Sequence, residues 1–483
     1  MNKSLKKNYI FNLVYQILIL FLPLITTPYV SRVLGASNLG IYSFTTSITA
    51  YFILFGNLGI TMYGQREIAY FQKDKKSYSK VFYEISIFKT ITMFFSILFF
   101  YLFFILRTNE YSLYFTILLI ELSASIFDIS WFFQGMEDFK KTVSRNFIIK
   151  IICVVLIFTF VKGEDDLVTY FIIYSLSNLL GNISMWVYIP KCVCKTALQT
   201  LNIFRHFKPT VSLFIPQVAI QVYTILDRTM IGLIISDKAQ VGFYDQAQKI
   251  IKILLTIVTA LGTVMLPRIA NNFANGNNQI IKEYIYKSLR VAYCMAFPFV
   301  FGICLISKEF VPLFLGNGYD TVVYLMCIIS PIILFIATSS TIGNQFLLPT
   351  KRQREFTISV IVGALLNLIL NLILIYKFSS IGASIATVCA ELSVASIQLY
   401  FVRHDLSIKK IIMSSKNYFL SAVLMFAICN CINFFNFSIV FSLFFKIIIG
   451  SVIYVVGLVI LKDSFVYEIK HIVNKALKNH KIT

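Results

Sequence analysis

The chain has 483 residues, of which 58% are hydrophobic and only 13% are charged, and its mean hydropathy is +0.79. A soluble protein usually has about a quarter of its residues charged, because a long folded chain needs a polar surface. The composition therefore excludes a soluble enzyme, a nucleic-acid-binding protein and a secreted module. It predicts a protein that crosses a membrane many times, and the net charge of +21 has to be explained within that class.

Fourteen stretches are candidates for membrane-crossing helices, each of which needs about 20 apolar residues. In chain order the predicted spans are 9–31, 38–60, 81–106, 111–134, 146–161, 167–189, 209–234, 240–265, 291–307, 321–347, 356–376, 380–402, 417–433 and 438–461. The connections between them are too short for a soluble domain. We therefore expect an all-α integral membrane protein.

The basic residues are distributed unequally between the two sides of this topology. Loops on the side of the N-terminus carry 31 Lys and Arg residues, whereas the opposite loops carry 6. Lys and Arg accumulate on cytoplasmic loops, so both termini are predicted to be cytoplasmic. The longest outer loop is 308–320, which leaves no outer domain for the catalytic groups of a membrane glycosyltransferase or polymerase.

Motifs for metals, cofactors or covalent chemistry are missing from the sequence. The nine Cys residues and four His residues follow no metal-ligand spacing, and neither HExxH nor GxxxxGK[ST] occurs. The apolar run after Lys3, Lys6 and Lys7 lacks a small-residue cleavage site, so it is interpreted as a retained first helix. We expect no catalytic residue, no metal and no cofactor.

A faint internal repeat relates the two halves of the chain. Gly40-Ile41-Tyr42 precedes Arg66, and Gly242-Phe243-Tyr244 precedes Arg268. The interval from Gly to Arg is 26 residues in both copies, which are offset by 202 residues. Many transporters are built from two repeated bundles with the substrate at their interface, so the repeat favours a transporter.

Several ionisable residues fall inside the predicted helices, where each charge costs roughly 2.5–3.5 kcal/mol at the bilayer centre. The cations are Lys89, Lys150, Arg228, Lys249, Lys252 and Lys446, and the acids are Glu121, Asp128, Asp227 and Glu391, with Glu84 and Asp245 nearer helix ends. These groups must face a water-filled cavity, pair with one another or reach the headgroups. We therefore expect an aqueous lumen.

The span 240–265 carries a polar stripe. Asp245, Lys249 and Lys252 are spaced i, i+4 and i+7, which places them on one helix face. The stripe predicts a cavity lining; the alternative is a helix end near the headgroups. In the preceding span Asp227 and Arg228 are neighbours and cannot face one spot, and the planar guanidinium of Arg228 suits a phosphate.

Glu121 and Asp128 are seven residues apart and share a helix face. They are candidates for exchanging a proton or holding Na⁺ during transport. Alternatively, they balance the charges of Lys150 or Lys89.

Two further intramembrane charges have simpler explanations. Glu391 stands among small residues that allow close helix packing, so it is either a buried paired acid or a functional one. Lys446 lies in the outer third of the last span, and we expect its side chain to reach the membrane surface.

Four motifs together resemble the Wzx-type polysaccharide flippases of the multidrug/oligosaccharidyl-lipid/polysaccharide exporter superfamily. They are Thr27–Gly35 (TPYVSRVLG), Gly40–Phe44 (GIYSF), Gly64–Ala69 (GQREIA) and Trp131–Glu137 (WFFQGME). Looser matches are Asp227-Arg228, Gly242-Phe243-Tyr244 and Leu266-Pro267-Arg268. The similarity runs from about residue 10 to about residue 400.

The resemblance implies two six-helix lobes around a central cavity, predicted as 1–205 and 206–405, and a terminal helix pair with a basic tail, 406–483. It also implies alternating-access transfer of an undecaprenyl-diphosphate-linked oligosaccharide to the outer leaflet of the bacterial plasma membrane. Arg32 and Arg228 match motif positions, and Lys249 and Lys252 join them on placement alone as the predicted cationic site. The coupling ion, H⁺ or Na⁺, stays open.

The partners that the resemblance implies are the lipid-linked substrate, membrane lipids, and a polymerase and glycosyltransferases of the same pathway. The main alternative is a multidrug or small-cation antiporter of the same fold, which would favour a cavity dominated by acids and aromatic residues. A membrane glycosyltransferase or polymerase and a non-transporting scaffold are further alternatives.

Overall fold

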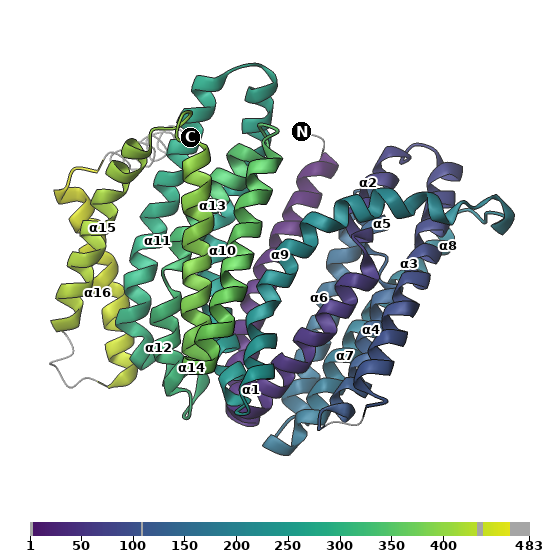
Figure 1. Ribbon diagram of the computed structural model, residues 1–483, viewed down its shortest axis with the longest axis horizontal. Coiled ribbons are helices and arrows are strands. Elements are labelled where there is room, and N and C mark those ends of the chain that lie inside the picture. The colour runs from purple at the N-terminus through teal and green to yellow at the C-terminus, as the bar shows by residue number, and fades with distance from the viewer. Residues whose placement is uncertain (1–2, 108–109, 432–437, 464–483) are drawn as a thin grey trace, which may run out of the picture. The chain divides into compact units, whose positions relative to one another are not determined.

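The computed structural model describes residues 3–107, 110–431 and 438–463 (Figure 1), and every regular element in these ranges is a helix. The chain forms two compact units, Met1–Gly242 and Phe243–Thr483. Each of the fourteen predicted spans falls on a helical stretch, although the last two residues of 417–433 lie outside the described residues. The prediction of an all-α membrane protein is confirmed.

The first unit contains nine α-helices, joined in part by short 3₁₀ turns. They are α1 (Lys3–Asn57), α2 (Ile60–Tyr70), α3 (Lys75–Phe104), α4 (Ser112–Phe127), α5 (Ser130–Gly135), α6 (Phe139–Phe160), α7 (Leu167–Ser184), α8 (Ile189–Cys192) and α9 (Phe207–Ile234), with turns η1 (Glu164–Asp166), η2 (Met185–Tyr188), η3 (Leu198–Thr200) and η4 (Ile203–His206). Helix α10 (Ala239–Ala274) begins in this unit and continues into the second.

The described residues of the second unit form the remainder of α10 and six further α-helices, with one π-helical segment. They are α11 (Asn278–Leu315), α12 (Asp320–Ile329), α13 (Ile332–Ser339), the π-helix η5 (Ser340–Leu347), α14 (Gln353–Phe401), α15 (Ile408–Cys431) and α16 (Ile439–Ile460). Helices α12, α13 and η5 together cover the predicted span 321–347.

Two long helices each contain two predicted spans joined by a backbone kink. In α1 the kink is at Gly35, with φ 74° and ψ 172°. In α14 it is at Ser379, with φ 51° and ψ −130°, and a non-glycine residue at such a positive φ stores strain of about 1–3 kcal/mol. Four of the fourteen predicted spans are therefore the two halves of α1 and the two halves of α14. The kink between the halves explains why the sequence predicts two spans in each helix.

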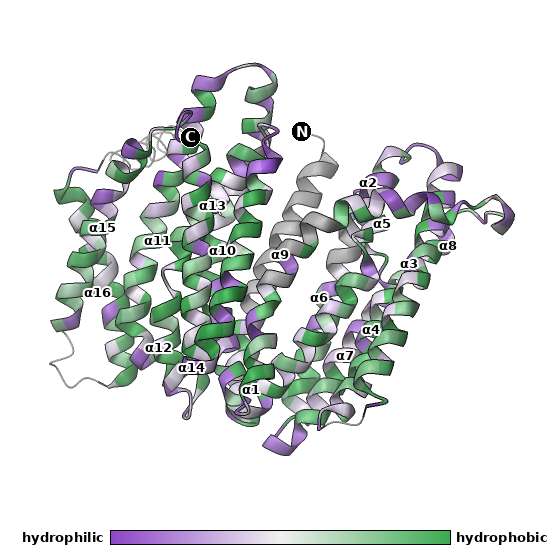
Figure 2. Ribbon diagram, in the orientation of Figure 1, coloured by the Kyte–Doolittle hydropathy of each residue, from purple (hydrophilic) through white to green (hydrophobic). Residues whose placement is uncertain are grey.

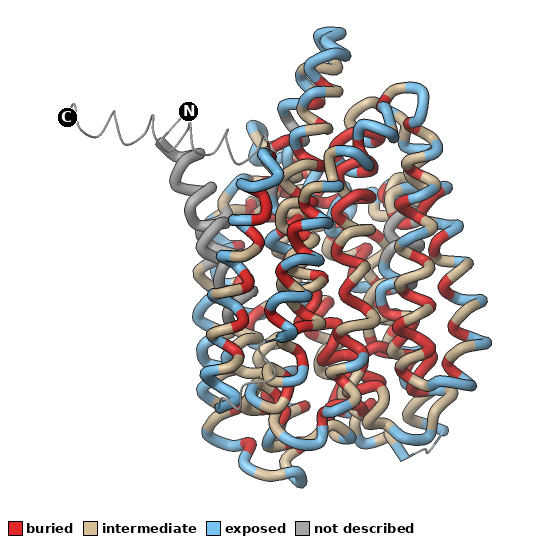
Figure 3. Tube along the Cα trace, turned by 90° about the vertical axis from the view of Figure 1, so that its left-hand side faces the viewer, coloured by how far each residue is buried: buried red, intermediate tan, exposed pale blue. Residues whose placement is uncertain are grey.

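The described helices are long and apolar enough for a membrane. Nine helical stretches within the described residues meet both criteria, and Figure 2 shows hydrophobic residues along the helices with hydrophilic ones gathered at their ends and loops. Large apolar side chains are exposed along these helices, for example Leu365, Leu372 and Ile448. Buried and exposed positions alternate along the helices in Figure 3. The chain is a multi-pass membrane protein.

An aromatic cluster forms the best-packed part of the first unit. Trp131 of α5 is completely buried and stacks with Phe82 of α3, their ring centroids 5.7 Å apart. A Cβ atom added at Gly64 of α2 would lie 2.6 Å from the Trp131 ring, so only glycine allows this approach. Two of the motifs that carry the family resemblance, Gly64–Ala69 and Trp131–Glu137, therefore pack against each other.

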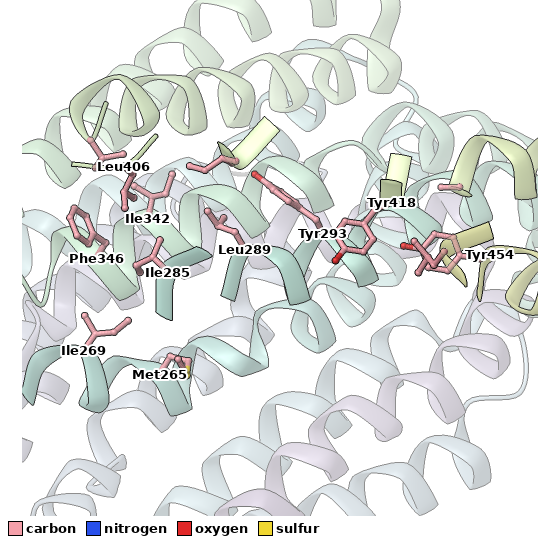
Figure 4. Close-up of a cluster of buried hydrophobic side chains, with 14 of the residues drawn as sticks. Met265, Ile269, Ile285, Leu289, Tyr293, Ile342, Phe346, Leu406, Tyr418 and Tyr454 are labelled. Carbon is pink, nitrogen blue, oxygen red and sulfur yellow. The ribbon is translucent and has the colours of Figure 1, made fainter. Parts of the chain in front are cut away.

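The core of the second unit joins the terminal helices to α11 (Figure 4). Three tyrosines contribute both ring surface and a hydroxyl bond. Tyr293 of α11 shares a hydrogen bond of 2.9 Å with Thr338, Tyr454 of α16 donates to the Cys294 carbonyl at 2.8 Å, and Tyr418 of α15 donates to an Asp463 carboxylate oxygen at 3.1 Å. Helices α15 and α16 are thus an integral part of this unit.

Lys446 corrects one expectation. Its side chain is 1% exposed and forms an ion pair with Glu309 of α11, so the prediction that it reaches the membrane surface is wrong. The sequence places Glu309 in a loop 137 residues away, and no local pattern links the two.

The predicted lobe boundaries at 205 and 405 stay predictions. The boundary between the two compact units falls after Gly242, and α9 packs on α1 within the first unit.

Candidate transport site

The polar stripe of α10 lies in the second unit. Asp245 is buried and its Oδ2 atom lies 2.7 Å from Nζ of Lys249, as the i, i+4 spacing predicts. Gln248 donates to the Tyr244 hydroxyl at 2.8 Å, and that hydroxyl shares a bond of 2.9 Å with Thr387 of α14. The stripe is therefore anchored by hydrogen bonds at its first turn.

The two lysines of the stripe differ in their surroundings. Lys249 is paired with Asp245, yet 41% of its side chain is exposed, and Lys252 is an exposed residue less than one turn further on. Both ammonium groups are therefore accessible in the structure. The carboxylate of Asp245 reduces the net charge of its pair with Lys249.

The arginines of the predicted site belong to the first unit. Arg32 is an exposed residue of α1, just before the kink at Gly35, and Arg228 is a partly buried residue of α9. Asp227 is 5% exposed. Tyr51 of α1 lies within electrostatic reach of both Asp227 and Arg228. Whether the four predicted cations meet one ligand stays a prediction.

Hydroxyl groups connect α1 to α9 next to Arg228. The Thr229 hydroxyl shares a hydrogen bond of 2.8 Å with Ser47 and donates to the Tyr51 hydroxyl at 3.4 Å. All of these residues belong to the first unit. The contacts fix the rotation of α9 about its axis, and with it the direction in which Arg228 leaves the helix.

Lys89 and Asp128 lie together at the end of α4. Lys89 is 2% exposed and donates from Nζ to the Asp128 carbonyl at 2.8 Å, and its charge acts on the Asp128 carboxylate. The same carboxylate accepts from the Ser130 backbone N–H at 2.9 Å, and the Arg145 guanidinium also acts on it. These contacts support the charge-balancing interpretation of Asp128.

Three other predicted residues are dispersed. Lys150 of α6 is partly buried, with its charge acting on the Cys153 thiol one turn on. Glu391 is a partly buried residue of α14. Glu121 of α4 has a buried Oε2 atom with no hydrogen-bond partner among the described residues.

Sequence reasoning missed a buried network in the first unit. Glu84 of α3 is completely buried; its Oε2 atom lies 2.6 Å from the Arg205 guanidinium and 3.0 Å from Nε2 of His206. Its other oxygen accepts from the Asn202 backbone N–H at 2.8 Å, and the Tyr63 hydroxyl lies 2.7 Å from Nδ1 of His206. Burial lowers the pKa of His206 from its ordinary value, and the bond to Glu84 opposes that shift.

This network fastens the segment before α9 onto α3. Glu84 is separated from its partners by 118 to 122 residues, so no local spacing could have revealed them. The available signal was an acid near the start of a membrane helix, which requires a partner.

The glycines of the internal repeat lie against each other. A Cβ atom added at Gly40 would collide with the Lys238 carbonyl oxygen, and one added at Gly242 would collide with the Ala36 carbonyl oxygen. Helix α1 and the start of α10 therefore approach to backbone contact. Both glycines belong to the first unit, and their packing gives a physical reason for the Gly-x-Tyr pattern in both copies.

Solved structures with a similar fold define the class. The lipid II flippase MurJ in an inward closed conformation superposes with a TM-score of 0.74 at 17% identity, covering 94% of this chain and 98% of that chain. An inward-facing multidrug resistance transporter of the MATE family, within the MOP superfamily, gives 0.66 at 13% identity, covering 82% and 95%. The chain has the fold of this transporter superfamily.

Sequence comparisons identify the family within that class. A family model described as polysaccharide biosynthesis protein matches residues 5–273, more than half of the chain, and the MatE model matches residues 213–373. The chain belongs to the polysaccharide biosynthesis protein family. The resemblance inferred from the four motifs is thereby confirmed.

Several of the curated relatives are named as transporters or flippases. A putative O-antigen transporter of Escherichia coli K12 is 29% identical over 408 residues, covering 83% of this chain and 97% of the relative. A putative O-antigen transporter of Shigella dysenteriae is 21% identical over 62% of this chain and 75% of the relative. A probable low-salt glycan biosynthesis flippase of Haloferax volcanii is 26% identical over 39% of each chain.

Proposed function

We propose that this protein is a flippase that moves undecaprenyl-diphosphate-linked oligosaccharide repeat units from the inner to the outer leaflet by alternating access, for surface polysaccharide synthesis. The observation that carries the proposal is the near full-length similarity to a putative O-antigen transporter, together with membership of the polysaccharide biosynthesis protein family. In this view the protein is a transporter and not an enzyme.

The charged residues give the proposal a physical basis. A diphosphate needs cations that attract it but release it after transfer, so moderately exposed groups serve better than a tight clamp. Arg32 and Lys252 are exposed, and Lys249 is shared with Asp245. Arg228 would add a planar guanidinium that can bond two phosphate oxygens at once.

Location and partners follow from the same reasoning. The excess of Lys and Arg on alternate loops supports a bacterial plasma membrane protein with both termini in the cytoplasm. The lipid tail of the substrate would stay in the bilayer while the head group crosses. A polysaccharide polymerase and the glycosyltransferases that build the repeat unit are the partners that this role requires.

Depletion of the protein in its native host tests the proposal. We expect the linked lipid to accumulate on the inner leaflet while surface polysaccharide falls. Unchanged lipid and polysaccharide with increased drug accumulation would instead establish the multidrug antiporter. Linked oligosaccharide that reaches the outer leaflet but stays unpolymerised would indicate a polymerase.

Single substitutions test the cations. Arg228→Ala and Lys249→Ala should each abolish export of surface polymer at normal protein abundance, measured by polymer staining and immunoblot. Arg403→Ala is the matched control, because Arg403 is an exposed residue outside the predicted spans and its guanidinium stacks 3.7 Å above the Tyr400 ring. Normal export by both the Arg228 and Lys249 variants would exclude the proposed cation path.

A further inference from the structure

Glu121 is a predicted intramembrane acid whose surroundings the proposed flippase function leaves unexplained. Its Oε2 atom is buried and has no hydrogen-bond partner among the described residues. Helix α4, which carries it, packs closely against α7, α3 and α1 within the first unit. Glu121 is partly buried, and a buried oxygen atom without a partner must be accounted for by the protonation state of the acid or by a ligand.

Two tyrosines of a small aromatic group lie within electrostatic reach of Glu121. Tyr42 of α1 lies 4.9 Å from Tyr170 and 5.9 Å from Tyr174 of α7, measured between ring centroids, and the two α7 rings are 6.4 Å apart. The two that reach Glu121 are Tyr42 and Tyr174. Neither tyrosine hydroxyl donates a hydrogen bond to the buried Oε2 atom.

The remaining ionisable groups on the neighbouring helices do not balance Glu121. From α6, Cys153 faces Tyr174, and Lys150 acts on that thiol. From α3, Lys89 is engaged with Asp128. Among the described residues no cation acts on Glu121, whose environment is set by burial.

We propose that Glu121 is a proton-binding site, occupied in this conformation, that exchanges its proton with water when the site opens. An ionised carboxylate without a donor costs far more to bury than a neutral carboxyl group. The step involves only the O–H bond, because the carboxylic acid transfers its proton to a water molecule and the carboxylate later takes one back from hydronium. The link between this exchange and substrate movement rests on the proposed flippase function.

Sodium does not suit the same geometry. A hard cation needs a shell of several oxygen ligands. The described residues contain no group of three or more His, Cys, Asp or Glu side chains that could hold a metal ion. A proton needs no coordination shell.

Infrared spectroscopy of the full-length protein in lipid nanodiscs tests the site without any substrate. At neutral pH, the difference spectrum of wild type minus Glu121→Gln should contain a carboxylic-acid C=O band that shifts in D₂O. The matched control is Asp128→Asn, at the C-terminal end of the same helix and beside Lys89, whose difference spectrum should lack that band. A Glu121→Gln difference confined to carboxylate bands would overturn the proposal.

Two further arms complete this test. Repeating the spectra in sodium chloride and in choline chloride at constant pH should give the same band; its loss on adding sodium would overturn the proton assignment in favour of sodium. If Glu121→Gln does not fold, Glu121→Asp replaces it and should move the band. A band that stays in place would then show that it belongs to another acid.

Transport in proteoliposomes containing undecaprenyl-diphosphate-linked oligosaccharide separates this proposal from the proposed function. The wild-type rate should change when a pH gradient is imposed, and the Glu121→Gln rate should be equal with and without it. The infrared band without any transport would uphold the proton site and reject the flippase. Transport without the band would reject the proton site and uphold the flippase.

Discussion

Glu84 and Glu121 are two glutamates of the same unit with opposite surroundings. Glu84 meets the Arg205 guanidinium, the His206 ring and a backbone N–H. Glu121 has a buried oxygen atom with no hydrogen-bond partner in the described residues and lies within electrostatic reach of Tyr42 and Tyr174. The first acid is therefore stabilised as a carboxylate, whereas the second is stabilised only as a neutral acid.

The difference teaches how a membrane protein uses a buried acid. With donors on several sides, the charge fastens two segments together and cannot change without loss of structure. Without donors, the protonation state can follow the access of water, which suits a group that changes during a transport cycle. The predictions below test this contrast, beginning with the largest expected effect.

Glu84→Gln should destabilise the first unit by about 2–3 kcal/mol, since removing one partner of a buried ion pair costs about 3–5 kcal/mol and the Arg205 side chain is 42% exposed. Thermal unfolding followed by tryptophan fluorescence would measure it. Both Trp residues, 131 and 186, lie in this unit, and Trp131 packs on Phe82. Glu121→Gln is the matched control and should change stability by less than about 0.5 kcal/mol. Equal losses from the two variants would remove the contrast.

Lys446→Met extends the comparison to the ion pair of the second unit. It leaves Glu309 without its partner, and we expect a loss of about 2 kcal/mol. The double variant Lys446→Met, Glu309→Gln should recover most of that loss, because no unpaired charge stays behind. Aggregation temperature in detergent would measure both. A double variant as unstable as the single one would show that packing, and not charge, holds α16 to α11.

Asp128→Asn should have a smaller effect. The Asp128 carboxylate accepts from the Ser130 backbone N–H and lies near Lys89, so removal of its charge weakens one charge-assisted hydrogen bond. We expect a loss of about 1 kcal/mol in the same fluorescence measurement. A gain in stability would indicate that Asp128, like Glu121, is buried without adequate compensation.

The pH dependence around Glu84 should be the smallest effect. Burial lowers the pKa of His206 in the folded state, so below its ordinary value of about 6.5 the unfolded state binds more protons. Stability therefore falls as pH decreases through this range. The melting temperature of His206→Asn should fall less than that of wild type between neutral and mildly acidic pH. Parallel curves would exclude a role for His206 titration.

The sequence predicted the helices well and the partners of charged residues poorly. The fourteen spans are visible because membrane crossing needs a long apolar run, which is a local property. The Asp245–Lys249 pair is also local, since one helical turn separates the two residues. The Lys446–Glu309 pair depends on how α16 packs on α11, and its prediction failed for that reason.

The family motifs were predicted in part: the sequence shows the motifs but not their contacts. Gly64 and Trp131 are recognisable in the sequence, but their contact across α2 and α5 is visible only in the structure. The same holds for Gly40 and Gly242, whose shared pattern indicated a repeat without showing that the two glycines touch.

By itself the sequence determined the all-helical membrane class, the spans and the asymmetry of basic charge, because hydropathy and charge act residue by residue along the chain. Only the tertiary structure decided which buried charges are paired. It joined Glu84 to Arg205 and His206, and it left the Oε2 atom of Glu121 without a donor in the described part of the chain. The physical reason is that the cost of a buried charge depends on atoms within a few ångströms, and these belong to helices far apart in sequence.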